Sequence, residues 1–111
     1  MQEFDAINES IKQSKKIIEK ADAIVRLKSN ADFKLVIQDD YLKKYAAGLV
    51  YSKARIYNQD DKQQKALDGQ ILGVGHFVQY LDMVLTAGVT AQTALEDQEY
   101  ERTAMLQEGK I

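Results

Sequence analysis

No proline occurs anywhere in this chain of 111 residues, and this absence constrains its fold more than any other feature. Proline fixes φ and removes a backbone donor, so a chain without it leaves every segment free to run as one long helix. Apolar side chains recur at steps of three and four residues in segment after segment, which is the spacing of a helix face. The sequence therefore predicts an all-α protein: an elongated helical bundle of three long helices plus a shorter acidic C-terminal helix.

Length and composition fit one small soluble domain. The chain is long enough for a single hydrophobic core, and its 45% hydrophobic and 29% charged residues lie near the average of globular proteins. The N-terminal sequence MQEFDAINES lacks the apolar region of a signal peptide, and no stretch approaches the roughly 18 apolar residues of a membrane span. The absence of cysteine excludes disulfides and thiolate metal sites. We expect a cytoplasmic protein with no membrane partner.

The first helix is expected from about Gln2 to Leu27. Its apolar seam repeats every seven residues and has one polar member, Ser14. The seam consists of Phe4, Ile7, Ile11, Ser14, Ile18, Ala21 and Val25, widened by Ile17 and Ile24. Ser29 or Asn30 then provides a side-chain cap for the next helix.

The second helix is expected from about Ala31 to Tyr57. Its apolar residues cover more than one stripe, which predicts the most buried element of the protein. Asp39 and Asp40 interrupt these residues and mark a kink or a short break.

A turn at Asn58 to Asp61 leads into a third helix that should run to about Ala87. Gly88 is placed to end this helix in the left-handed conformation, and Thr90 or Thr93 to cap a fourth helix reaching about Gln107. This division predicts a helical bundle over residues 1–88 and an acidic C-terminal helix over residues 89–111. Because the apolar residues of this last helix are scattered, we expect a loosely held or projecting acidic arm that serves as a partner-binding tail. Its candidate contact residues are Glu96, Asp97, Glu99, Tyr100 and Glu101.

Three glycines lie close together in the third helix, where each costs about 1 kcal/mol relative to alanine. Gly69 and Gly73 are four residues apart and share one face, Gly75 follows, and Gly48 gives the second helix a similar smooth surface. These glycines predict either close packing of the second helix on the third or contact with a second subunit. If the packing is internal, Gly73→Leu should destabilise the fold.

No arrangement of residues nominates an active site, a cofactor or a metal. His76 is the only histidine, and Gly73-Val74-Gly75 lacks both a preceding strand and the lysine of a phosphate loop. The acidic pairs are adjacent in sequence, so on a helix their side chains point about 100° apart and cannot share one reacting atom. The sequence therefore predicts a protein that is not an enzyme.

A lysine stripe on the first helix is the candidate contact for an anionic partner. Lys12, Lys16 and Lys20 step by four residues, and Lys15 joins them. Acidic residues are interleaved with these lysines, and the isoelectric point of 5.4 lies well below the value of about 9 that marks nucleic-acid-binding domains. Nucleic acid is therefore not the favoured partner. Residues 1–58 hold eleven basic and eight acidic residues, and residues 59–111 hold four and nine, so one region can complement another.

Two stretches resemble a family of small helical proteins that tailed bacteriophages encode among their head and DNA-packaging genes. Arg26-Leu27 and the following NADFK, Ile37 and Tyr41-Leu42 are similar to the family's Arg-Leu, Asn-Pro-Asp-Phe-Lys, Ile and Tyr-Leu pattern, with Ala31 in place of the proline. LDGQILGVGHF at residues 67–77, followed by Tyr80-Leu81, resembles a second block. The resemblance covers residues 26–85, and it implies a phage context in the virion or the host cytoplasm but no activity.

Three functions follow as hypotheses. The first is a non-enzymatic phage structural or assembly protein that forms homo-oligomers or docks on a virion component through helix-mediated contacts. The second is a small inhibitor or adaptor that binds a host protein through the acidic tail. The third is a DNA-associated packaging factor that uses the lysine stripe.

Overall fold

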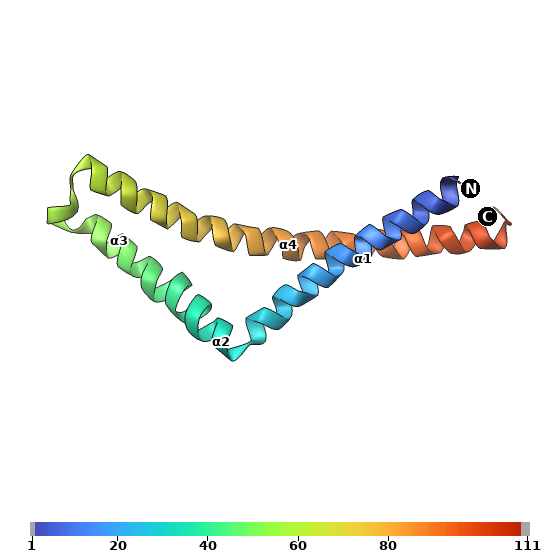
Figure 1. Cartoon of the computed structure of the whole chain (residues 1–111), viewed down its shortest axis with the longest axis horizontal. Helices are drawn as coiled ribbons and strands as arrows, with labels where there is room; N and C mark the ends of the chain where they lie inside the picture. The colour runs from blue at the N-terminus through green and yellow to red at the C-terminus, as the bar shows by residue number, and fades with distance from the viewer. Residues whose placement is uncertain (1, 110–111) are drawn as a thin grey trace. The chain divides into compact units, whose positions relative to one another are not determined.

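The computed structural model describes residues 2–109, which are almost entirely helical and contain no strand (Figure 1). The prediction of an all-α protein is confirmed. The elements in chain order are α1 (Gln2–Ser29), α2 (Ala31–Phe33), the π-helix η1 (Lys34–Tyr45), α3 (Ala46–Ala54), the 3-10 turn η2 (Ile56–Asn58) and α4 (Asp61–Gln107).

The chain divides into two compact units. Unit 1 comprises Met1–Val25 together with Asp82–Ile111, and unit 2 comprises Arg26–Leu81. Unit 1 thus combines most of α1 with the C-terminal part of α4. The boundary between units lies within α4 and not at residue 88, because that helix does not end there.

Two helices begin directly after a residue whose side chain caps them. The Phe33 N–H donates to Asn30 Oδ1 at 3.0 Å, so Asn30 caps α2 as expected. The Gln63 N–H donates to Asp60 Oδ1 at 2.9 Å, and Asp60 caps α4 in the same way. The turn predicted at residues 58–61 is therefore confirmed.

The second predicted helix is not one α-helix. Lys34–Tyr45 forms a π-helix, in which each N–H bonds five residues back and which is rare in proteins beyond a single turn. Asp39 and Asp40 lie inside it, where a kink was expected. The expectation that this region is the most buried is wrong, since Leu49 is its one buried residue.

The third and fourth predicted helices form one helix of 47 residues, α4. Gly88 lies in its interior and does not terminate it, and Thr93 does not cap a new helix. The glycine with positive φ near the C-terminus is Gly109, at 71°. The Gly109 N–H donates to the carbonyl of Leu106 at 3.3 Å, which closes the last turn of α4. A separate acidic helix is therefore a wrong prediction.

In unit 1, the C-terminal part of α4 packs antiparallel on α1. Ile7, Ile11, Leu95 and Met105 form a buried cluster, and Phe4 and Ile18 pack against it. The expectation of a projecting tail is wrong, because seam residues of α4 recur at three- and four-residue steps and face α1. This α4 core seam consists of Val84, Gly88, Ala91, Leu95, Gln98, Arg102 and Met105. On α1, Ile24 is buried while the predicted Val25 is exposed, because the packed face turns by one residue at the end of the seam.

Two polar pairs lie within this helix pair. Ser14 Oγ donates to Gln98 Oε1 at 2.9 Å, and Arg102 Nη1 donates to Asn8 Oδ1 at 3.1 Å. Because a partly buried polar group stays paired in one alignment only, these bonds fix the register of α4 on α1.

Gly88 marks the closest approach of the two helices in unit 1. A Cβ atom added at Gly88 would lie 2.3 Å from the Cβ of Ala21, far inside van der Waals contact. Glycine is required here because any side chain would force the helices apart.

In unit 2, η1 and α3 run antiparallel to the N-terminal part of α4. The rings of Tyr41 and Phe77 meet edge to face with centroids 5.9 Å apart. Lys53 Nζ lies 2.7 Å from Asp68 Oδ1. Leu49, Val74 and Leu81 are the buried apolar residues of this unit in the part of the chain described.

No apolar stretch long enough to span a membrane was expected, and α4 differs from this expectation. A window of 18 residues within this helix has a mean hydropathy of 1.2 and is 22% buried, so by length and composition the helix is long enough to cross a membrane. The core helix of a soluble protein meets the same criterion. The absence of a membrane partner therefore stays a prediction.

Candidate protein-interaction surfaces

The turn between α3 and α4 is held by a compact hydrogen-bond network around Gln64. Gln64 Nε2 donates to the carbonyls of Lys53 at 2.9 Å and Asn58 at 2.7 Å. Lys53 Nζ donates to Gln64 Oε1 at 2.7 Å, and Asn58 Nδ2 donates to the Ser52 carbonyl at 2.9 Å. Gln64 thereby satisfies the Lys53 carbonyl near the end of α3, where no further helical turn supplies a donor, and the Asn58 carbonyl at the end of η2. These hydrogen bonds hold the backbone of the turn in a defined conformation.

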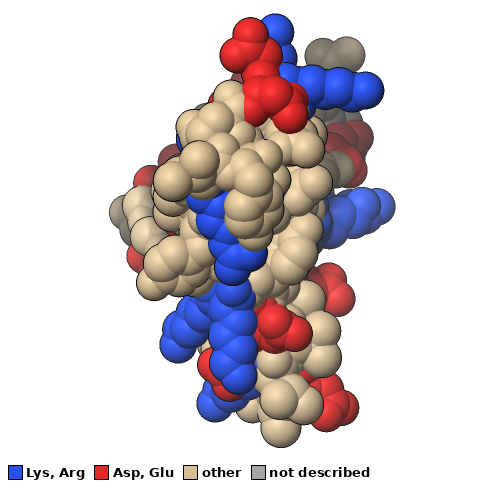
Figure 2. Space-filling view, turned by 90° about the vertical axis from the view of Figure 1, so that its left-hand side faces the viewer, with Lys and Arg blue, Asp and Glu red and all other residues tan. Residues whose placement is uncertain are grey.

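Large apolar side chains project from this turn and from the last turns of α3. Ile56 is 90% exposed, and Tyr51 and Tyr57 are also exposed. We call these three residues the hairpin tip. Arg55 packs over the ring of Tyr57, with its guanidinium carbon 5.9 Å from the ring centroid, and donates to the Tyr57 hydroxyl. In the space-filling view from this end, uncharged atoms cover much of the near face and basic side chains run through them (Figure 2).

The hairpin tip was not among the residues nominated from the sequence. A signal for it existed, because Ile56 and Tyr57 come directly before the turn residues 58–61 and belong to no helical seam. Two apolar side chains at that place have no helix face of the same chain to pack against.

The lysine stripe is exposed on α1. Lys12, Lys15, Lys16 and Lys20 all lie outside the buried seam, on the solvent side of the helix. Glu9 and Glu19 are exposed beside them, so the surface carries both signs of charge. Contact with an anionic partner remains a prediction.

The acidic residues of the predicted tail lie on the exposed surface of a docked helix, and Glu101 lies at the edge that faces α1. Glu96, Asp97, Glu99, Tyr100 and Glu101 are all exposed, while Leu95 and Met105 of the same segment are buried against α1. These five residues are available to a partner as predicted, but they are presented by a packed helix and not by a free arm.

The four nominated glycines do not mediate packing within unit 2. A Cβ atom added at Gly48, Gly69, Gly73 or Gly75 would meet no atom within 4 Å. The prediction that the second and third helices pack closely at these glycines is therefore wrong. The other interpretation, contact with a second subunit, stays open. The close approach occurs at Gly88, a residue expected to end a helix.

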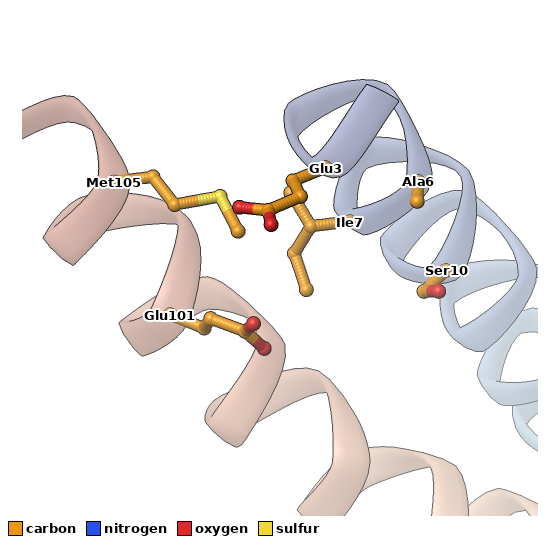
Figure 3. Close-up of a pocket in the computed structure, with 6 residues that line it drawn as sticks. All are labelled: Glu3, Ala6, Ile7, Ser10, Glu101 and Met105. Atoms are coloured by element: carbon orange, nitrogen blue, oxygen red, sulfur yellow. The ribbon is translucent and has the colours of Figure 1, made fainter. Parts of the chain in front are cut away.

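An open pocket of about 390 Å³ lies in unit 1 between the start of α1 and the end of α4. Figure 3 shows the carboxyl groups of Glu3 and Glu101 projecting into the space between the helices, beside Ile7 and Met105. Ala6 and Ser10 complete the lining. The two carboxylates are not joined by a third ligand, because no group of three potential metal-binding side chains occurs among residues 2–109.

The pocket in unit 1 is open to solvent, and the hairpin tip exposes large apolar side chains. Comparison of the chain with protein-family models, with curated proteins and with solved structures finds no match.

Proposed function

We propose that this chain is a non-enzymatic structural or assembly protein of a tailed bacteriophage, acting through helix-mediated contacts with other protein subunits. In this proposal its helices complete a helical bundle only when further subunits join them. The resemblance of residues 26–85 to small phage proteins provides the phage context.

The observation that carries the proposal is the hairpin tip. Burying a side chain such as Ile56 is worth about 1.5–3 kcal/mol, and the chain leaves it almost fully in water. The hydrogen bonds of Gln64 hold the turn, so little ordering entropy is lost when a partner covers the tip. Aromatic side chains with an arginine beside them are the composition found at the energetic centres of protein interfaces.

We expect a charge at the tip to abolish assembly without harming the fold. In cells infected by phage that lacks this gene, the wild-type chain supplied from a plasmid should restore the yield of intact particles, whereas Ile56→Asp should not. The mutation places an uncompensated carboxylate in an apolar interface, where its desolvation costs several kcal/mol. The measurement is the number of intact particles per infected cell.

Val89→Asp provides the matched control. Val89 is also exposed, it belongs to unit 1 and not to the hairpin tip, and the mutation introduces the same charge. Equal particle yields with the two variants would show that the tip is not an assembly contact. Circular dichroism of both purified variants confirms that each has kept its helices.

A further inference from the structure

The pocket in unit 1 combines apolar side chains with two carboxylates. Ile7 and Met105 are its buried apolar members, and the carboxyl groups of Glu3 and Glu101 project into the same space (Figure 3). Its volume of about 390 Å³ lies within the roughly 300–1,000 Å³ of pockets that bind small molecules, so it has room for one or two side chains of another protein. A cation between the carboxylates would offset their mutual repulsion. The pocket therefore suits a basic side chain that has an apolar neighbour.

The segments that form this pocket are strongly acidic. Residues 2–11 of α1 and residues 96–107 of α4 together hold seven acidic residues and one basic residue. The basic residue is Arg102, whose side chain donates to Asn8 within the helix pair. A partner that approaches the pocket therefore meets a negative potential, which favours a basic surface.

The hairpin tip in unit 2 has the complementary chemistry. Residues 41–59 hold four basic residues and no acidic one. Ile56 is almost fully exposed, and the guanidinium of its neighbour Arg55 lies over the ring of Tyr57. Because a guanidinium has five N–H donors, Arg55 can bond a carboxylate while it keeps its bond to the Tyr57 hydroxyl. An exposed apolar side chain and a cation are thus presented next to each other.

We infer that the hairpin tip of one copy of this chain binds in the unit 1 pocket of a second copy. Ile56 packs against Ile7 and Met105 of the other copy. Arg55 lies between the carboxylates of Glu3 and Glu101. The partner is a second copy because both the apolar group and the charge that the pocket requires are present on this chain. The inference deepens the proposed function, on which it rests for the premise that the hairpin tip is a protein contact.

The contact joins two different surfaces, so it is heterologous. It requires only unit 2 of one copy and unit 1 of the other, and each copy then still offers one tip and one pocket. Repeated contacts of this kind build a ring or a filament. A two-fold contact of tip against tip would instead bring the basic residues of two 41–59 segments together, which charge repulsion disfavours.

Two charge reversals test the contact from its two sides. Arg55→Glu places an acidic tip against the acidic pocket, and Glu101→Arg places a basic group where Arg55 binds. We expect the wild-type chain to associate increasingly with concentration, and each variant alone to associate at least about tenfold more weakly, because like charges then meet. Both residues are exposed, so the variants keep the fold. Sedimentation velocity over a concentration series measures the Kd.

Mixing the two variants tests whether the tip binds the pocket directly. The mixture contains one unchanged tip, on the Glu101→Arg chain, and one unchanged pocket, on the Arg55→Glu chain. We therefore expect the mixture to form a 1:1 complex with a Kd within about threefold of the wild-type value, although neither variant associates well alone. Labelling one of the two chains identifies the mixed complex.

Two further variants are matched controls. Lys44→Glu makes the same charge change as Arg55→Glu in unit 2, but Lys44 is an exposed residue of η1 outside the hairpin tip. Glu99→Arg makes the same change as Glu101→Arg, but Glu99 does not line the pocket and lies about 200° around the helix from Glu101. Both controls should leave the Kd unchanged at an ionic strength of about 0.15 M, where exposed charges more than about 8 Å apart are largely screened.

Three results would overturn the inference. They are a wild-type monomer at all concentrations, a Glu101→Arg chain that associates as tightly as the wild type, and a mixture that binds no better than either variant alone. The second result would assign self-association to a surface other than the pocket.

Particle yield separates this inference from the proposed function. If Ile56→Asp abolishes particles while the purified wild-type chain stays monomeric, the hairpin tip contacts a different subunit and only the self-association is wrong. If the chain associates through the pocket but Ile56→Asp leaves the particle yield unchanged, only the proposed function is wrong.

Discussion

Replacing Gly88 with alanine should destabilise the protein by about 1–3 kcal/mol, although alanine is by far the better helix former. The added methyl carbon would lie 2.3 Å from the Cβ of Ala21, which cannot rotate away. The two helices of unit 1 must therefore separate locally and lose contacts around the crossing point. Urea denaturation followed by circular dichroism measures the change in the free energy of unfolding.

Two further variants make this result specific. Gly75→Ala meets no atom within 4 Å and should stabilise the protein by about 1 kcal/mol through helix propensity alone. The double variant Ala21→Gly with Gly88→Ala moves the methyl group from one helix to the other and should return the stability close to that of the wild type. If Gly88→Ala and Gly75→Ala stabilise the protein equally, the close crossing of α1 and α4 does not exist.

Ile11→Ala should produce the largest loss of stability among single truncations, about 2–5 kcal/mol. Ile11 is 3% exposed and belongs to the cluster that joins α1 to the end of α4. Truncation removes apolar contact and leaves a cavity that two helices cannot close without moving. Since a small domain has a total stability of about 5–15 kcal/mol, this loss should be visible as a large fall in the urea midpoint.

Ile17→Ala is the matched control for this truncation. Ile17 lies in the same helix, loses the same atoms and is 41% exposed, so its cost should be well below that of Ile11→Ala. Equal losses for the two variants would place Ile11 outside the core and would contradict the packing of unit 1.

The sequence predicted those parts of the fold that depend on neighbouring residues. The cap at Asn30 and the turn at residues 58–61 are local, since the donor and the acceptor lie within a few positions of each other. The seam of α1 could also be predicted as far as Ala21, because the spacing of its residues is visible in the sequence without knowing which helix packs against it.

The continuity of α4 could not be predicted in this way. A glycine after a helical run fits a helix end and a close helix crossing equally well, and the residue that decides between them is Ala21, far away in the sequence. The three-four steps that continue through Gly88 to Ala91 and Leu95 were the signal that favoured a continuous helix.

The docking of the C-terminal part of α4 was missed because two of its seam positions are polar. Gln98 and Arg102 resemble surface residues until Ser14 and Asn8 are placed opposite them. No sequence pattern marks η1 either, because its residues have ordinary helical spacing whichever carbonyl accepts each hydrogen bond.

The most direct test of the proposed function is quantitative mass spectrometry of highly purified particles of the phage that encodes this chain. We predict that the chain is present at a fixed copy number in whole multiples of the portal protein's copy number. Absence of the chain from particles would contradict its role as a virion component, and a copy number that varies between preparations would contradict a defined place in the assembly.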